Sequence, residues 1–175
     1  MTWYNAAVAE RRLYYPTDYA NLEVSDGFIF LNGPIQGAPD WQKDAVDLIH
    51  ATNPDIVIAS PRRDYLPMTF DYPAQVNWET VHRLLASKSG VNLYWLAKEL
   101  EDKHDVLRAY AQTTRFELAE SKVRHEVYGE KMVIGIEKGF SGARYIIQRF
   151  EEDCPDVPIA FSLEATVKEA IGLIG

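Results

Sequence analysis

Short apolar runs alternate with longer amphipathic stretches along most of the chain. Each run is continuous rather than interrupted by polar positions, as in strands that are covered on both faces. We predict five strands, at Phe28–Leu31, Asp55–Ala59, Val91–Leu96, Lys131–Ile136 and Val157–Phe161. Helical spacing predicts five helices, at Asp40–Ala51, Gln75–Ser87, Thr113 or Thr114 to Tyr128, Ala143–Glu152 and Leu163–Ile174.

This alternation predicts an α/β fold: a three-layer sandwich with a five-stranded parallel sheet between helices, flavodoxin-like or Rossmann-like. The 175 residues fit a single domain. Residues 1–25, rich in aromatic side chains, are expected to form an N-terminal arm or an edge element. The helix-prone stretch 97–112 interrupts the alternation, and we expect it to close over a site.

Residues with special backbone preferences mark several element ends. Pro39 suits the start of the first helix, and Ser162 is a natural cap for the last one. Gly129 is expected to end the helix that runs to Tyr128. The stretch 62–73, rich in proline, tyrosine and charge, is predicted to be a long loop.

Composition and charge narrow the class of partner. Hydrophobic residues make up 47% and charged residues 25%, which is ordinary for a globular protein. The net charge, 18 − 26 = −8, argues against a nucleic-acid polymer, whose phosphates are bound by Lys and Arg, but leaves a nucleoside or mononucleotide open. Cys154 is the only cysteine, so no internal disulfide can form and a reducing cytoplasm is expected. Neither a signal peptide nor an apolar run long enough for a membrane is visible, so we expect no membrane partner.

The turn after the first predicted strand is a candidate binding element. It reads Asn32-Gly33-Pro34, with Gly37 close behind. In open parallel sheets ligands sit at the carboxyl ends of strands. Gly33 lets a ligand approach the backbone closely, and Pro34 fixes its own φ. The turn matches neither a dinucleotide fingerprint nor a P-loop, and an ordinary tight turn is the alternative.

Glu117 is the first candidate for chemistry. It is expected in the first turn of its helix, where the helix dipole favours the ionised carboxylate. A carboxylate held at the edge of a sheet is what nucleophilic attack on a sugar carbon requires. Thr114 and Glu117 also have the spacing of a capping box, so N-capping without chemistry is the alternative.

Two further polar groups lie between the second and third predicted strands. Arg62-Arg63-Asp64 follows the second strand, and its guanidinium groups are suited to a phosphate or carboxylate; a surface charge cluster is the alternative. Glu79 lies inside the following helix and is either a second carboxylate of the site or a solvated helix residue.

Metal and cofactor chemistry are not indicated. The histidines have no metal-ligand spacing, and a single cysteine argues against a zinc site; they are His50, His82, His104 and His125. No G-x-S-x-G motif is present, which argues against an α/β-hydrolase triad. We therefore expect neither a metal nor a cofactor.

Several short motifs follow one another between residues 27 and 150. They are Phe28-Ile29-Phe30-Leu31-Asn32-Gly33-Pro34, Trp41, Ser60-Pro61-Arg62, Trp78-Glu79, Leu93-Tyr94-Trp95, Thr113-Thr114-Arg115-Phe116-Glu117-Leu118-Ala119 and Gly142-Ala143-Arg144-Tyr145. Their order and spacing resemble those of the nucleoside 2-deoxyribosyltransferase-like family. One departure is Ala119, where the family usually has glycine two residues after the nucleophile.

The resemblance implies roles for individual residues. In that family a glutamate at the position of Glu117 attacks C1′ of a 2-deoxynucleoside, releases the base and holds the sugar as an ester. By position, Glu79 would be an acid that orients the sugar hydroxyl or assists the base, and Tyr94 and Trp95 would stack on the base. The expected substrate-binding set is Asn32, Gly33, Pro34, Gly37, Arg62, Asp64, Tyr94, Trp95 and Thr114.

Three functions are consistent with these residues. The first is transfer of a deoxyribosyl group from one base to another. The second is N-glycoside hydrolysis of a nucleoside or nucleotide, favoured if Arg62 and Arg63 bind a 5′-phosphate. The third is non-catalytic nucleotide binding on the same fold. The resemblance also implies a homo-oligomer in which a neighbouring chain completes the site.

The glycosyl-transfer hypothesis carries a geometric expectation. Glu79 and Glu117 should point into one cleft near Gly33-Pro34. Two carboxylates in one cleft repel each other, so the pKa of one should rise while the other stays ionised.

Overall fold

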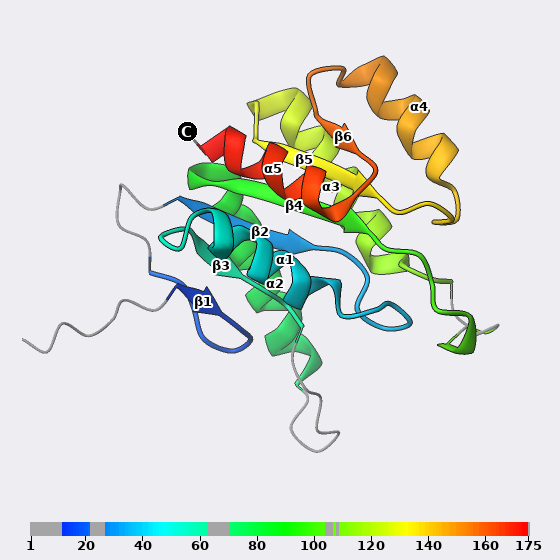
Figure 1. Cartoon of the computed structure of the whole chain (residues 1–175). Coiled ribbons are helices and arrows are strands. Elements are labelled where there is room, and N and C mark those ends of the chain that lie inside the picture. Colours follow the sequence, from blue (N-terminus) through cyan, green and yellow to red (C-terminus); the bar gives the residue numbers. More distant parts are fainter. Residues whose placement is uncertain (1–11, 22–26, 63–70, 104–106, 108, 175) are drawn as a thin grey trace, which may run out of the picture.

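The computed structural model describes residues 12–21, 27–62, 71–103, 107 and 109–174. Within them, six parallel strands form one sheet, and five α-helices cover its two faces (Figure 1). The strands are β1 (Leu13–Tyr14), β2 (Phe28–Asn32), β3 (Val57–Ala59), β4 (Val91–Leu96), β5 (Met132–Ile136) and β6 (Ile159–Ala160). The helices are α1 (Trp41–Thr52), α2 (Tyr72–Ser89), α3 (Gln112–Tyr128), α4 (Ala143–Asp153) and α5 (Leu163–Ile174).

The strand order places a topological switch point in the middle of the sheet. The order is β1-β3-β2-β4-β5-β6. Without β1, this is the doubly wound order of flavodoxin-like folds, so the predicted α/β sandwich is confirmed. The chain extends the sheet from β2 to β3 in one direction and from β4 onward in the other. Ligands in such folds bind beyond the carboxyl ends of the two strands that flank this point, here β2 and β4.

The sixth strand, β1, corrects the predicted number of five. It lies within the expected N-terminal arm and pairs with β3 through Leu13–Ile58 and Tyr14–Ala59, at the edge of the sheet. Two residues are too few to show the periodicity from which strands are predicted, and β1 exists because β3 offers an edge to pair with.

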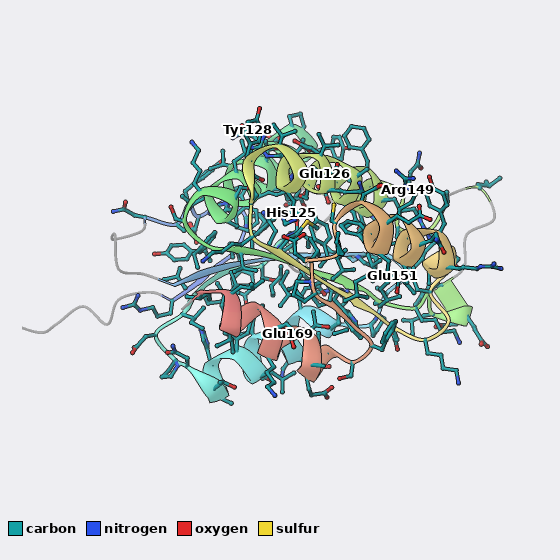
Figure 2. The ribbon with its side chains drawn as sticks, turned by 90° about the horizontal axis from the view of Figure 1, so that it is seen from above. His125, Glu126, Tyr128, Arg149, Glu151 and Glu169 are labelled. Atoms are coloured by element: carbon teal, nitrogen blue, oxygen red, sulfur yellow. The ribbon has the colours of Figure 1, made fainter. Side chains whose placement is uncertain are left out.

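Strand alternation divides the core between the two faces. Ile29 and Leu31 belong to an apolar cluster with α1 and α5, whereas Phe28 and Phe30 pack toward α2. Helices α3 and α4 cover β4 and β5 on the same face as α2. Figure 2 shows this division from above, with Glu169 of α5 on one side of the sheet and Tyr128 of α3 on the other. The continuous burial of β2, β4 and β5 follows from these two helical layers.

Most helix ends follow the expected chemistry. The Ser162 hydroxyl accepts a hydrogen bond from the Ala165 amide at 3.2 Å, and Gly129 ends α3 in the left-handed region at φ +68°. Helix α2 begins at Tyr72, with the Asp71 side chain as its cap, so the predicted loop over 62–73 ends earlier than expected. This earlier start adds a first turn that contains Tyr72 to the predicted helix.

Candidate active site

A cavity of about 300 Å³ lies at the switch point. Its floor is the end of β2 and the loop 33–37, and its walls are the first turns of α2 and the N-terminus of α3. Residues of the stretch 97–112, among them Glu99, Lys103 and Tyr110, line its remaining side. The position agrees with the ligand site that parallel doubly wound sheets share.

Tight packing fixes the loop 33–37. A Cβ at Gly33 would collide with the carbonyl oxygen of Trp95 and lie 2.5 Å from the Trp41 ring. The Trp41 indole N–H donates to the Pro34 carbonyl oxygen at 2.9 Å. Gly37 has φ +77°, and its carbonyl oxygen accepts a 2.8 Å hydrogen bond from the Leu100 amide. The loop therefore presents its backbone to the cavity in one conformation and ties the stretch 97–112 to β2.

Glu79 of α2 and Glu117 of α3 both line this cavity. The Gln75 amide donates to Glu79 Oε1 at 2.6 Å, and the Arg83 guanidinium donates to Glu117 Oε1 at 3.1 Å. Burial, and next the charge of Glu79, raises the pKa of Glu117 from 4.5 to about 7, although Arg83 acts in the opposite direction. Both protonation states of Glu117 are therefore populated near neutral pH.

The alternative role of Glu117, as the capping residue of its helix, is wrong, and so is its predicted place in the first turn. Helix α3 begins at Gln112, so Glu117 is its sixth residue and lies in the second turn, where the helix dipole is weaker. The N-cap residue of α3 is Ala111, which adopts the left-handed region at φ 55° and forms no side-chain capping hydrogen bond. Thr114 is a buried helical residue that lines the cavity, not the N-cap. The expectation that the helix start keeps Glu117 ionised is wrong as well, since burial raises its pKa.

Buried polar groups connect the cavity floor to the two helices. The Asn32 side chain donates to Asn92 Oδ1 at 3.1 Å, and Asn92 in turn donates to the Arg83 carbonyl oxygen at 3.2 Å. Among the described residues, Asn32 Oδ1 and Gln75 Oε1 are buried acceptors that have no hydrogen-bond donor. Both residues line the cavity, but these two oxygen atoms are themselves buried beneath its surface.

Three expected binding residues lie elsewhere. Tyr94 is fully buried, and its hydroxyl donates to the Glu117 carbonyl oxygen, so it cannot stack on a ligand. Trp95 points to the α1 and α5 face, because successive strand residues face opposite sides. Arg62 folds back onto Gln42 Oε1 at 2.8 Å and the Pro39 carbonyl oxygen at 2.9 Å, and it does not line the cavity.

The other expected residues divide simply. Asp64 lies outside the described residues. The structure brings Asn32, Gly33, Pro34, Gly37, Glu79, Thr114 and Glu117 together around one cavity.

Gln75 and Arg83 are not among the site residues predicted from the sequence. They lie one helical turn before and after Glu79, at a spacing of four residues, so the three polar side chains share one stripe of α2. Gln75 and Arg83 are also buried, at 4% and 5% exposure. Polar residues that recur at this spacing beside buried Trp78 and His82 were the available signal.

The described residues contain no group of three or more His, Cys, Asp or Glu side chains arranged to hold a metal ion. None of the helices in the described part of the chain combines the length and the apolar character of a membrane span. No family model matches the chain, and no curated protein matches it.

Proposed function

We propose that the protein cleaves the N-glycosidic bond of a 2-deoxynucleoside and transfers the deoxyribosyl group to another base through an ester of Glu117. The observation that carries this proposal is that Glu79 and Glu117, from different helices, line one cavity at the carboxyl end of β2. A double displacement of this kind requires one carboxylate as nucleophile and a second group to handle protons.

The steps follow from the roles of the two carboxylates. The ionised Glu117 carboxylate attacks C1′ as the C1′–N bond breaks, and the departing base takes a proton from Glu79 or from water. The sugar is then held as a glycosyl ester of Glu117. An acceptor base attacks C1′, the ester bond breaks, and the proton lost by the acceptor returns to Glu79. The sugar keeps its configuration because C1′ is inverted twice.

The cavity lining supports a sugar as the bound group. Glu79, Thr114 and Glu117 line the cavity, and their side-chain oxygen atoms can accept hydrogen bonds from sugar hydroxyls. Gln75 holds Glu79 in place by its 2.6 Å hydrogen bond.

The second candidate is an N-glycosidase that acts on nucleotides. Of the two residues expected to bind a 5′-phosphate, Arg62 is not part of the cavity and Arg63 lies outside the described residues. Two other features favour an anion there: Lys103 lines the cavity, and the N-terminus of α3 faces it without a side-chain cap. Free N–H groups at a helix N-terminus are suited to phosphate. Water would then replace the acceptor base in the second step.

We also propose that the active form is a homo-oligomer. Phe116, Ala119, Val123 and Val127 recur on one exposed face of α3, with Phe116 at 75% and Val127 at 63% exposure. A helix that is apolar on its outer face is suited to packing against a second copy of the chain. Phe116 is next to Glu117, so a second copy seated there would lie beside the cavity. Cys154 is buried and has no cysteine partner, which suits the cytoplasm as the working compartment.

The test is to identify products. The protein is incubated with a panel of 2-deoxynucleosides, ribonucleosides and 5′-nucleotides, with and without free acceptor bases, and products are separated by chromatography. Base exchange supports the transferase, and free sugar or sugar phosphate supports the N-glycosidase. Binding without turnover would overturn both in favour of a non-catalytic protein.

The covalent step has its own measurement. A slow substrate should add the mass of one deoxyribosyl group to the peptide that contains Glu117. Glu117→Gln should abolish the adduct and turnover, whereas Glu126→Gln, the same change at an exposed position of α3, should keep both. An active Glu117→Gln variant would exclude the mechanism.

A further inference from the structure

Arg83 joins the two helices that carry the cavity's carboxylates. It lies on α2, and its two terminal nitrogens bind different carboxylates of α3: Nη1 is 3.1 Å from Glu117 Oε1, and Nη2 is 2.7 Å from Glu120 Oε2. The Arg83 side chain is 6% exposed, the Glu117 side chain 17% and the Glu120 side chain 38%. The contact to Glu117 is therefore shielded from water, while the contact to Glu120 lies nearer the surface.

The backbone of Arg83 is fixed independently of these ion pairs. Its carbonyl oxygen accepts hydrogen bonds from the Ser87 hydroxyl at 2.9 Å and from the Asn92 side chain at 3.2 Å. Asn92 lies on β4, so the central strand holds this turn of α2. Because the Arg83 backbone is held in this way, its guanidinium can occupy few positions, and it is therefore suited to orient a carboxylate.

Charged side chains of both signs surround Glu117, and the carboxylates outnumber the cations. Helix α2 contributes Glu79 and Arg83, α3 contributes Glu120, and Glu99 and Lys103 line the cavity. Tyr94 of β4 packs beneath Glu117 as a neutral phenol, because burial raises its pKa far above the neutral range. Two carboxylates thus act against the ionisation of Glu117, and the guanidinium in contact with it acts in favour.

We propose that Arg83 is the positioning residue of the cavity: it holds Oε1 of Glu117 and favours the anionic form of this carboxylate, and Glu120 moderates the effect by sharing the guanidinium. Arg83 binds this carboxylate through Oε1, so in this proposal Oε2 is the oxygen that meets a ligand. The catalytic consequence rests on the proposed function, but the ionisation of Glu117 does not.

Substitutions of Arg83 and of Glu120 should shift the pKa of Glu117 in opposite directions. Removing the guanidinium should raise the pKa of Glu117, whereas removing the charge of Glu120 should lower it, since Glu120 repels Glu117 and competes for Arg83. A residue that served only to pack α2 against α3 would change stability and leave the titration of Glu117 where it was.

The measurement is a ¹³C NMR titration of the glutamate carboxyl groups in the ligand-free protein. The Glu117 resonance is assigned by its loss in Glu117→Gln. Wild type should titrate near pH 7, Arg83→Met should titrate higher by about 1 pH unit or more, and Glu120→Gln should titrate lower. Arg83→Lys, which keeps the charge but loses the two-pronged contact, should lie between wild type and Arg83→Met.

An unchanged Glu117 titration in folded Arg83→Met would overturn the inference. If Arg83→Met does not fold, Arg83→Lys and Glu120→Gln decide, and the absence of opposite shifts would equally overturn it. Enzyme kinetics separates the two proposals. In an active enzyme, Arg83→Lys should lower kcat more than it raises KM and move the midpoint of the pH profile upward. If no glycosyl transfer is found but the titration moves as described, only the proposed function fails.

Discussion

The hydroxyl of Tyr94, on the central strand β4, donates a 3.0 Å hydrogen bond to the backbone carbonyl oxygen of Glu117 on α3. The same hydroxyl is 2.8 Å from the hydroxyl of Ser121, one turn further along the helix. Tyr94 is fully buried, so both contacts form away from water. They fix the rotation of α3 above the sheet, and with it the direction in which the Glu117 side chain leaves the helix.

Tyr94→Phe should therefore weaken both the fold and the site. The change leaves the Ser121 hydroxyl without this contact and the Glu117 carbonyl oxygen without an additional donor, so we expect the free energy of unfolding to fall by about 1–3 kcal/mol. Urea denaturation measures this loss. If α3 is held as described, turnover falls as well at a temperature where the variant is fully folded. Full turnover with lower stability would show that the contact is structural only.

Glu117→Gln should increase stability at neutral pH. The pKa of Glu117 is raised in the folded protein to about 7 from 4.5, so the folded state binds a proton more tightly than the unfolded chain. The contribution of Glu117 to stability is therefore greatest below pH 4.5 and declines as the pH rises toward 7. The neutral amide removes this decline, with a gain on the order of 2 kcal/mol above pH 7. Denaturation of both proteins at pH 5 and pH 8 measures it, and an equal or lower stability of the variant at pH 8 would contradict it.

Buried His82 should give the opposite pH dependence. Its Nε2 accepts a hydrogen bond from the Ala20 amide at 3.0 Å, and Nδ1 is 2.8 Å from the Trp78 carbonyl oxygen, which defines a neutral ring. Its neighbours are the uncharged rings of Tyr19, Phe28, Phe30 and Trp78. Burial lowers its pKa in the folded state, so only the unfolded chain gains a proton just below pH 6.5.

The contribution of His82 is thus complete above pH 6.5 and declines as the pH falls through that value. His82→Gln keeps a hydrogen-bonding side chain that does not titrate. The difference in stability between wild type and this variant should shrink from pH 7.5 to pH 5.5. A difference that stays constant would show that His82 does not sense pH.

Gly33→Ala should destabilise the fold strongly. The new Cβ would collide with the Trp95 carbonyl oxygen and lie 2.5 Å from the Trp41 ring, and backbone cannot move aside as a flexible side chain would. We expect a loss of about 3 kcal/mol. Gly172→Ala is the matched control, since nothing beyond its own helix backbone and chain neighbours lies within 4 Å of the new Cβ and alanine favours a helix. Thermal unfolding of the two variants should give shifts of opposite sign.

The exposed face of α3 predicts an effect on assembly. Val127→Lys places a charge in the stripe of Phe116, Ala119, Val123 and Val127, and should dissociate an oligomer that packs through it. Tyr145→Lys on α4, at 71% exposure, is the control outside this stripe. Sedimentation velocity compares the variants, and an unchanged oligomer in Val127→Lys would place the interface elsewhere.

The sequence predicted the sheet well because its strands are buried on both faces. Continuous apolar runs such as Phe28–Leu31 and Val91–Leu96 have no other stable location in a chain of this length. The same reasoning brought Glu79 and Glu117 to one edge, since the carboxyl ends of parallel strands and the helices beside them meet there.

The errors arose where contacts between distant residues decide the outcome. Arg62 looked free to bind an anion, but carbonyl oxygens of the stretch 35–39 and Gln42 occupy its guanidinium, and nothing local indicates this. Tyr94 and Trp95 could not both stack on one ligand, because adjacent strand residues face opposite layers. This correction was accessible from the pattern alone. The start of α3 was not, since Ala111 adopts a positive φ that few alanines adopt.

The division of the core between the two faces of the sheet determines which residues of a strand can be substituted during evolution. On β4, Leu93 belongs to the apolar cluster shared with α1 and α5, so side-chain volume decides which residues can replace it, and isoleucine or methionine would be tolerated. Its neighbours Asn92 and Tyr94 form specific hydrogen bonds, and few other side chains could form the same bonds in their place. Adjacent residues of one strand are therefore constrained differently during evolution: one by its volume, the next by its hydrogen bonds. A related protein could therefore differ at most core positions on the α1 and α5 side of the sheet. If it kept the hydrogen-bonded residues on the α2 and α3 side, it would retain the same chemistry despite low sequence identity.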